Sequence, residues 1–222
     1  MKIKSFTFNP YAENTYVLYD DTSECVIVDP GCYGRSEERI LEEFIAKEKL
    51  HPVRLINTHC HIDHVFGVPF VTGKYDLDLE IHKGELIVLN YTEQVGRMYG
   101  TPTEQMPEPG GFLDENDVIA FGRTKLEILF TPGHSPASIC FFNRAEGQLI
   151  SGDVLFKGSI GRTDLPGGDY ETLMQSIFEK LMALDDDVVV YPGHMDPTTI
   201  GAERRNNPFL HEWLLHNADK ET

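Results

Sequence analysis

The chain has 222 residues, 41% of them hydrophobic, which is enough to bury a sizeable core within one α/β domain spanning residues 1–222. Its 36 acidic residues outnumber its 19 basic ones, and the formal net charge of −17 opposes binding to a phosphate backbone. These values exclude nucleic acid as the expected partner.

Signals for export or membrane insertion are not visible in the sequence. Residues 1–6 lack the apolar stretch of a secretory signal, and no segment approaches the roughly 20 apolar residues of a membrane span. The four cysteines show neither a Cys-x-x-Cys spacing nor the pattern of a disulfide framework. We therefore expect a cytoplasmic protein with no membrane partner.

The first half of the chain predicts a sheet interrupted by helices. Apolar runs bounded by turn residues predict strands, and apolar residues at helical spacing predict helices. Ser36 can cap the first helix, and Pro52 ends the helical run. The expected strands are residues 2–8, 14–19, 24–29, 53–58 and 79–82; the expected helices are 36–50 and 85–98, with a helical turn at 65–70 and a surface loop, a candidate lid, at 102–111.

The second half predicts a similar arrangement. Its expected strands are residues 117–120, 124–130, 138–142, 148–150 and finally 188–191, with a helix at 170–184. We expect this half to repeat the architecture of the first, although the two halves show no evident sequence identity.

Residues 58–64 carry the clearest functional signal. Three imidazoles and a carboxylate follow an expected strand here, namely His59, His61, Asp63 and His64. Neutral imidazole and carboxylate are the usual ligands of divalent transition metals, and they can converge if the backbone turns sharply. A loop between a strand and a helix is a usual place for chemistry on an α/β scaffold, so the segment predicts a metal site.

Three further candidate ligands follow the ends of three later strands. They are His134, Asp153 and His194, and the two histidines lie in the same Pro-Gly-His turn. With the first four they make seven ligands, which is what two metals sharing a bridging carboxylate require.

This ordered set resembles the metallo-β-lactamase-fold hydrolases, and the match extends from about residue 6 to about residue 210. The resemblance implies a four-layer αββα sandwich, with two mixed β-sheets flanked by helices and the metals at one edge of the sheets. It also implies two three-ligand sites and a bridging carboxylate: His59, His61 and His134; Asp63, His64 and His194; and Asp153 between them. Zinc is the expected metal, and iron or manganese would suit the same ligands.

Two features favour the binuclear hydrolases within this superfamily. Its lactam-cleaving members generally lack the carboxylate that Asp153 supplies, and its flavin-partnered diiron oxidoreductases carry a Glu where this chain has His61. In a binuclear hydrolase, a hydroxide shared by the metals attacks an ester, thioester or amide carbonyl. Asp63 would be the catalytic residue that orients this hydroxide or carries its proton, and Asp29 is either a turn residue or an outer partner of a ligand histidine.

The glycine-rich stretch at 154–169 resembles that of glyoxalase II-like thioesterases. Arg162 and Lys157 could bind a carboxylate of a glutathione-like group, and Arg162 could equally pair with Asp164 or Asp169. The chain resembles short enzymes of this kind, without a C-terminal helical domain. We therefore expect a small acyl thioester, such as S-D-lactoylglutathione, as the substrate.

Two other functions fit the same residues. A persulfide dioxygenase would use one iron held by His59, His134 and Asp153, act on glutathione persulfide, and have no need of the remaining ligands. A non-catalytic binding module would be expected to have lost ligands, whereas the sequence retains all seven.

The remaining candidate residues have structural interpretations. Cys60 lies between two candidate ligands, but side chains alternate in an extended segment, so it should point away from the metals. Of the histidines outside the ligand pattern, His82 is the one that could line a pocket. Apolar residues around Trp213 predict a terminal helix that docks on the core or makes a contact in a homodimer.

Overall fold

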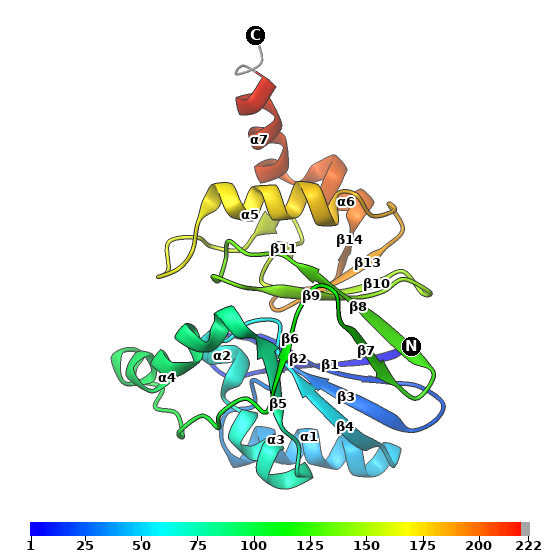
Figure 1. Cartoon of the computed structure of the whole chain (residues 1–222), viewed down its shortest axis with the longest axis vertical. Coiled ribbons are helices and arrows are strands. Elements are labelled where there is room, and N and C mark those ends of the chain that lie inside the picture. The colour runs from blue at the N-terminus through cyan, green and yellow to red at the C-terminus, as the bar shows by residue number, and fades with distance from the viewer. Residues whose placement is uncertain (219–222) are drawn as a thin grey trace.

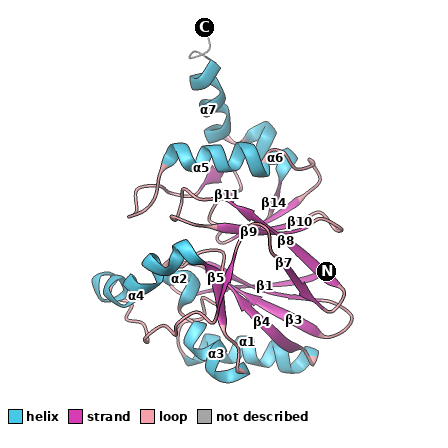
Figure 2. Cartoon of the chain, viewed as in Figure 1, coloured by secondary structure: helices cyan, strands magenta, loops and turns pink. Residues whose placement is uncertain are grey.

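The computed structural model describes residues 1–218, and its main feature is a pair of six-stranded sheets that lie face to face (Figure 1). Helices cover the outer face of each sheet, so the backbone forms four layers (Figure 2). The four-layer αββα sandwich expected from the sequence is therefore confirmed.

The first sheet comes from the N-terminal half of the chain. In spatial order its strands are β1 (Lys2–Phe8), β2 (Glu13–Tyr19), β3 (Glu24–Val28), β4 (His51–Ile56), β5 (Leu79–His82) and β6 (Gly111–Leu113). The strands β1 to β3 are antiparallel, and β3 to β6 are parallel. Parallel neighbours require crossovers, which contain α1 (Arg35–Glu48), α2 (Ile62–Val65), α3 (Val68–Tyr75), a 3₁₀ turn (Lys83–Glu85) and α4 (Leu86–Tyr99).

The second sheet comes from the C-terminal half. Its strands are, in spatial order, β14 (Thr198–Thr199), β13 (Val189–Pro192), β10 (Gln148–Gly152), β9 (Ile139–Asn143), β8 (Thr124–Phe130) and β7 (Val118–Phe121). The strands β7 to β10 form an antiparallel meander, and β13 pairs parallel to β10. Their crossover holds the hairpin of β11 (Leu155–Phe156) and β12 (Ser159–Ile160), then α5 (Tyr170–Ser176) with its π-helical extension Ile177–Leu181. Each half thus begins with antiparallel strands and crosses over to a parallel one, as expected.

Alternation of side chains along the strands explains the layers. In β3, Ile27 points to the core beneath α1 and α3, and its neighbour Val28 points to the core between the sheets. In β9, Phe141 joins the core between the sheets, and Phe142 joins the core beneath α5. Each such side chain contributes about 1.5–3 kcal/mol when fully buried, so both faces of each sheet are stabilised by packing.

Several boundaries differ from those expected. The strands β6, β11, β12 and β14 were not predicted because two or three residues are too few to show alternation, and 188–191 is consequently not the final strand. Pro52 lies inside β4 rather than before it, next to a shift in register between Cys25 and Val26 that accommodates its missing N–H. The expected helix at 170–184 is α-helical only in its first part.

The C-terminal segment forms two helices, α6 (Ile200–Asn206) and α7 (Pro208–Ala218), where one was expected. The helix α7 docks through buried Leu210 and through Trp213, whose ring meets that of Tyr170 edge-on at 5.8 Å. Homodimer formation stays a prediction. Within residues 1–218, no helix combines the length and the apolar character needed to cross a membrane.

Candidate metal centre

Four loops at one edge of the two sheets deliver all the candidate ligands. Each loop follows the end of a strand, where the backbone leaves the sheet. After β4 and into α2 come His59, His61, Asp63 and His64; after β8 comes His134; after β10 comes Asp153; and after β13 comes His194. The structure therefore gathers residues from both halves of the chain.

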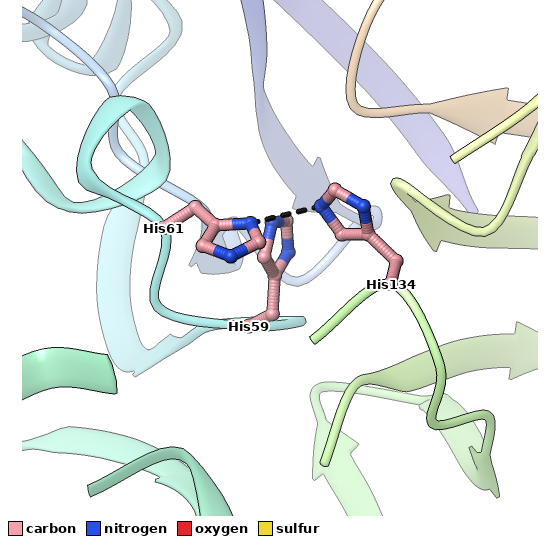
Figure 3. Close-up of side chains that lie close together, drawn as sticks. All are labelled: His59, His61 and His134. Carbon is pink, nitrogen blue, oxygen red and sulfur yellow. Dashed lines mark hydrogen bonds between the residues drawn. The ribbon is translucent and has the colours of Figure 1, made fainter. Parts of the chain in front are cut away.

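Three histidines form the first group. One nitrogen from each of His59, His61 and His134 lies within 4.8 Å of the others. Figure 3 shows the three rings turned toward one another, with Nδ1 of His61 2.9 Å from Nε2 of His134. Since Nδ1 of His134 donates a hydrogen bond to the Arg162 carbonyl at 2.8 Å, its Nε2 presents a lone pair to this gap. A single proton or a cation between the rings would satisfy both nitrogen atoms.

A second group lies beside the first. Ligand atoms of Asp63, His64 and His194 also lie within 4.8 Å of one another. Oδ2 of Asp63 is 3.1 Å from Nε2 of His194 and 3.8 Å from Nε2 of His64. This group therefore offers two nitrogen atoms and one oxygen atom.

Asp153 lies between the two groups. Its Oδ1 is 3.4 Å from Nε2 of His64, and its Oδ2 is 3.5 Å from Nε2 of His134 and 3.4 Å from Nε2 of His194. One carboxylate therefore faces imidazoles of both groups.

Hydrogen bonds fix the orientation of the other histidine rings. Nδ1 of His64 donates to Asp29 at 3.1 Å, and Nδ1 of His194 donates to the carbonyl of Ala12 at 3.2 Å. The Thr58 hydroxyl donates to Asp29 at 2.6 Å, so it accepts from Nδ1 of His59 at 3.0 Å. With Nδ1 held by an outer partner, each Nε2 points into the site, and Nε2 is the nitrogen that these rings would offer to a metal.

Asp29 therefore acts as an outer partner and not as a turn residue alone. In addition to the bonds from His64 and the Thr58 hydroxyl, it accepts the backbone N–H of Thr58 at 2.7 Å. Its backbone has φ of 47°, in the left-handed region that Asp tolerates better than most residues.

The charges of the two groups differ. Burial lowers the pKa of His61 to about 3 and lowers that of His59 well below its usual value, so both rings are neutral. Burial acts in the same direction on His64 and His194, but Asp153 and Asp63 outweigh it and raise both pKa values, that of His194 to about 9. The two carboxylates therefore place negative charge beside His64 and His194, which a bound cation would balance.

Unpartnered atoms test whether a metal fits. Among the described residues, Nε2 of His59, Nε2 of His64 and Oδ1 of Asp153 are buried and lack a hydrogen-bond partner. Burying such groups unpaired is costly, and all three face the same space. Gly193 keeps this space open, because a Cβ there would lie 2.1 Å from Oδ1 of Asp153 and 2.7 Å from Cε1 of His64. The imidazole and carboxylate donors and their unpartnered atoms suit divalent metal ions.

The sequence profile of the metallo-beta-lactamase superfamily matches residues 8–194, which include all seven candidate ligands and most of both sheets. The chain belongs to this superfamily. The family expectation from the ordered ligands is thereby confirmed, and the chain is an enzyme of a metallo-hydrolase superfamily.

One sequence relative and two crystal structures are similar to this chain over nearly its whole length. It is 36% identical over 215 residues to the hydroxyacylglutathione hydrolase GloC of Haemophilus influenzae, covering 95% of this chain and 98% of that one. The crystal structure of the BLEG-1 B3 metallo-beta-lactamase superposes with a TM-score of 0.87 at 36% identity, covering 94% and 99% of the two chains. The crystal structure of TTHA1623 in a di-iron-bound form superposes with a TM-score of 0.84 at 35% identity, covering 93% of this chain and 100% of that one.

A cavity of about 950 Å³ opens onto the cluster of candidate ligands. It is lined by His61, Asp63, His134, Asp153 and His194, and one wall is formed by α4. The loop at 102–111 does not line the cavity, so the expected lid is not found there. The helix α4, which precedes that loop in the chain, forms the cavity wall.

Other candidate residues lie as follows. Arg162 lines the cavity and forms a bidentate pair with Asp164, at 2.7 Å for both contacts. Lys157 is exposed in the turn between β11 and β12 and does not line the cavity. His82 does not line it either, because its Nδ1 accepts the backbone N–H of Gly84 and its ring packs on Phe130. His82 is therefore a structural residue, and the alternative that it lines a pocket is not met.

Sequence patterns missed one residue beneath the ligand loops. Glu85 is fully buried and accepts hydrogen bonds from the backbone N–H groups of Cys60 and Ala137, both at 2.9 Å, and from the Ser135 hydroxyl. Cys60 itself belongs to the apolar core and to none of the candidate ligand groups among the described residues. No motif marks Glu85, since a Glu at the start of a helix is ordinary.

Proposed function

We propose that this chain is a binuclear metal-dependent hydrolase that cleaves an acyl thioester. The observation that carries the proposal is the convergence of seven candidate ligand side chains, among which buried nitrogen and oxygen atoms lack hydrogen-bond partners. A single-metal site would need about half of these ligands.

The ligand assignments follow the two groups and the carboxylate between them. Zinc is our expected metal, and the similarity to a di-iron protein supports iron as the alternative. The proposed sites are His59, His61 and His134; Asp63, His64 and His194; and Asp153 shared by both.

Support for the thioester comes from the hydroxyacylglutathione hydrolase relative, which is similar over nearly the whole of both chains. A B3 metallo-beta-lactamase is similar to the same degree, so a β-lactam is the competing substrate to assay. Glutathione recognition through Arg162 would require its pair with Asp164 to open, and Lys157 is not in the cavity. We therefore propose cleavage of a thioester bond and do not propose recognition of glutathione.

Two bound divalent ions would lower the pKa of a water toward 7 and polarise the acyl carbonyl. The chain supplies the rest. Asp63 lines the cavity, and we assign it the role of orienting the attacking water and accepting its proton. Asp29 holds His64 directly, and His59 through Thr58, so the donor atoms stay aligned through the reaction.

The first experiment measures metal content on anaerobically purified protein. Parallel assays follow hydrolysis of S-D-lactoylglutathione, hydrolysis of a cephalosporin and oxygen uptake with glutathione persulfide. Close to two metals per chain with thioester cleavage supports the proposal. One iron with oxygen uptake would replace it with the dioxygenase, and lactam cleavage alone would replace it with a lactamase.

Variants test whether both sites are needed. His61→Ala and Asp63→Ala should each reduce thioester hydrolysis by at least about 100-fold, because each removes a ligand. His216→Ala on exposed α7 is the matched control and should leave the rate unchanged. Activity that survives in both ligand variants would exclude the binuclear mechanism.

A further inference from the structure

The helix α4 presents an apolar face to the cavity. Ile87, Tyr91 and Met98 are four and seven residues apart, so they share one side of the helix. They are 60%, 55% and 74% exposed, although the opposite side of the helix is buried through Leu89 and Gly96. A ligand that covers large apolar side chains exposed in this way is stabilised, because apolar surface is removed from water.

Other segments bring apolar side chains to the same cavity. Tyr11 comes from the β1–β2 turn, Phe156 from β11, Leu165 and Pro166 from the loop before α5, and Met195 from the turn after His194. Tyr11 is held in place, since its ring stacks near that of Phe66 and its hydroxyl bonds to the Thr101 hydroxyl. An apolar group entering the cavity would therefore meet apolar surface on several sides.

The cavity offers little to an anion away from the metals. Arg162 is the single Lys or Arg among the described residues that line it, and its Nε and Nη2 already donate to Asp164, whose carboxylate offsets its charge. Asp63 and Asp153 add negative charge, and the chain as a whole carries −17. A substrate arm that bears carboxylates would lose hydration here and would find no cation that is free of a carboxylate partner.

We infer that the substrate is a thioester with an uncharged apolar acyl chain or ring, roughly four to eight carbon atoms long, that lies against α4. This inference rests on the proposed thioester hydrolysis and narrows its substrate class. The apolar arm covers Ile87, Tyr91 and Met98, and the scissile carbonyl lies toward the candidate ligands that also line the cavity.

A chain-length series tests it. The probes are acetyl, butanoyl, hexanoyl and octanoyl thioesters of N-acetylcysteamine, a neutral thiol, compared with S-D-lactoylglutathione on the metal-loaded enzyme. Up to the length that fills the cavity, kcat/KM should rise by about fourfold per methylene, the equivalent of about 0.8 kcal/mol. A flat or falling series, or S-D-lactoylglutathione as the best substrate, would overturn the inference.

A pair of matched variants locates the apolar contact. Ile87→Ser should lower kcat/KM for the octanoyl thioester by about tenfold and that for the acetyl thioester by less than about twofold. Ile40→Ser is the control, because Ile40 is 48% exposed on α1, remote from the cavity lining. Equal losses on both substrates, or no loss on either, would contradict a contact between the acyl chain and α4.

A binding experiment separates this inference from the proposed function. Calorimetry with the uncleavable octyl thioether of N-acetylcysteamine reports recognition without hydrolysis. Binding by the wild type that weakens about tenfold in Ile87→Ser supports the apolar subsite even if no thioester is cleaved, in which case only the proposed reaction fails. Absence of binding overturns the inference whatever the rates.

Discussion

Replacing Glu85 with glutamine should loosen the metal centre without removing a ligand. The Glu85 carboxylate lies between the loop that carries His59 and His61 and the loop that carries His134, and every partner it has is a donor. One oxygen accepts the Cys60 N–H, and the other accepts the Ala137 N–H. Burial raises the pKa of Glu85, and these hydrogen bonds oppose that shift.

The size of the stability loss in Glu85→Gln follows from the number of N–H and O–H groups that donate to the carboxylate. In Glu85→Gln one oxygen becomes an NH2 group, which must face the backbone N–H of either Cys60 or Ala137 and leave it unpaired. An unpaired buried donor costs about 1–3 kcal/mol, so we expect the free energy of unfolding to fall by about 2 kcal/mol. Because both ligand loops then move more freely, the metal dissociation constants should rise by about tenfold.

Two measurements check these values. Urea unfolding of the metal-free protein gives the stability change, and competition with a chromogenic chelator gives the metal affinity. Glu93→Gln is the control, since Glu93 lies exposed on α4 in a 3.1 Å pair with Arg97 and should change stability by less than about 0.5 kcal/mol. If Glu85→Gln matches this control in both measurements, the carboxylate does not hold the ligand loops.

The remaining predictions concern the ligand cluster. Asp29→Asn should weaken metal binding by about 10- to 100-fold, because an amide cannot accept from Thr58 and His64 as the carboxylate does; wild-type affinity in chelator competition would refute this. Gly193→Ala should lower the metal content of purified protein, since the added Cβ displaces Asp153, and two tightly held metals per chain would contradict the reasoning. Chelation should lower the melting temperature by roughly 10 °C, given a loss of about 4 kcal/mol when metal is present at 1,000 times its dissociation constant. Added zinc should restore the melting temperature, and no change on chelation would show that the metals do not stabilise the fold.

The convergence of the candidate ligands was predictable because metal chemistry uses few residue types. All seven follow the ends of strands, and apolar runs such as residues 126–130 in β8 located those ends. The environment of Arg162 was not predictable, since a cation in a glycine-rich loop fits a substrate carboxylate and Asp164 equally well. Only the folded geometry shows that Asp164 is its partner.

The cavity wall shows a different limit of sequence patterns. Ile87, Tyr91 and Met98 have the spacing of an ordinary core-facing helix, and spacing alone does not tell whether a second apolar face meets protein or open space. Glu85 is similar, because its partners are backbone groups far away in the sequence. Such contacts depend on tertiary structure and leave no local pattern.

The ligands come from both sheets, and this has a consequence for the order of folding. The contact between His61 and His134 spans 73 residues, and it forms only when the two halves of the chain have docked. An unfolded chain can offer a metal the short segment from His59 to His64, a weak and incomplete set of donors. Tight metal capture is therefore a late event, which locks the assembled sandwich and mainly slows its opening rather than speeding its formation.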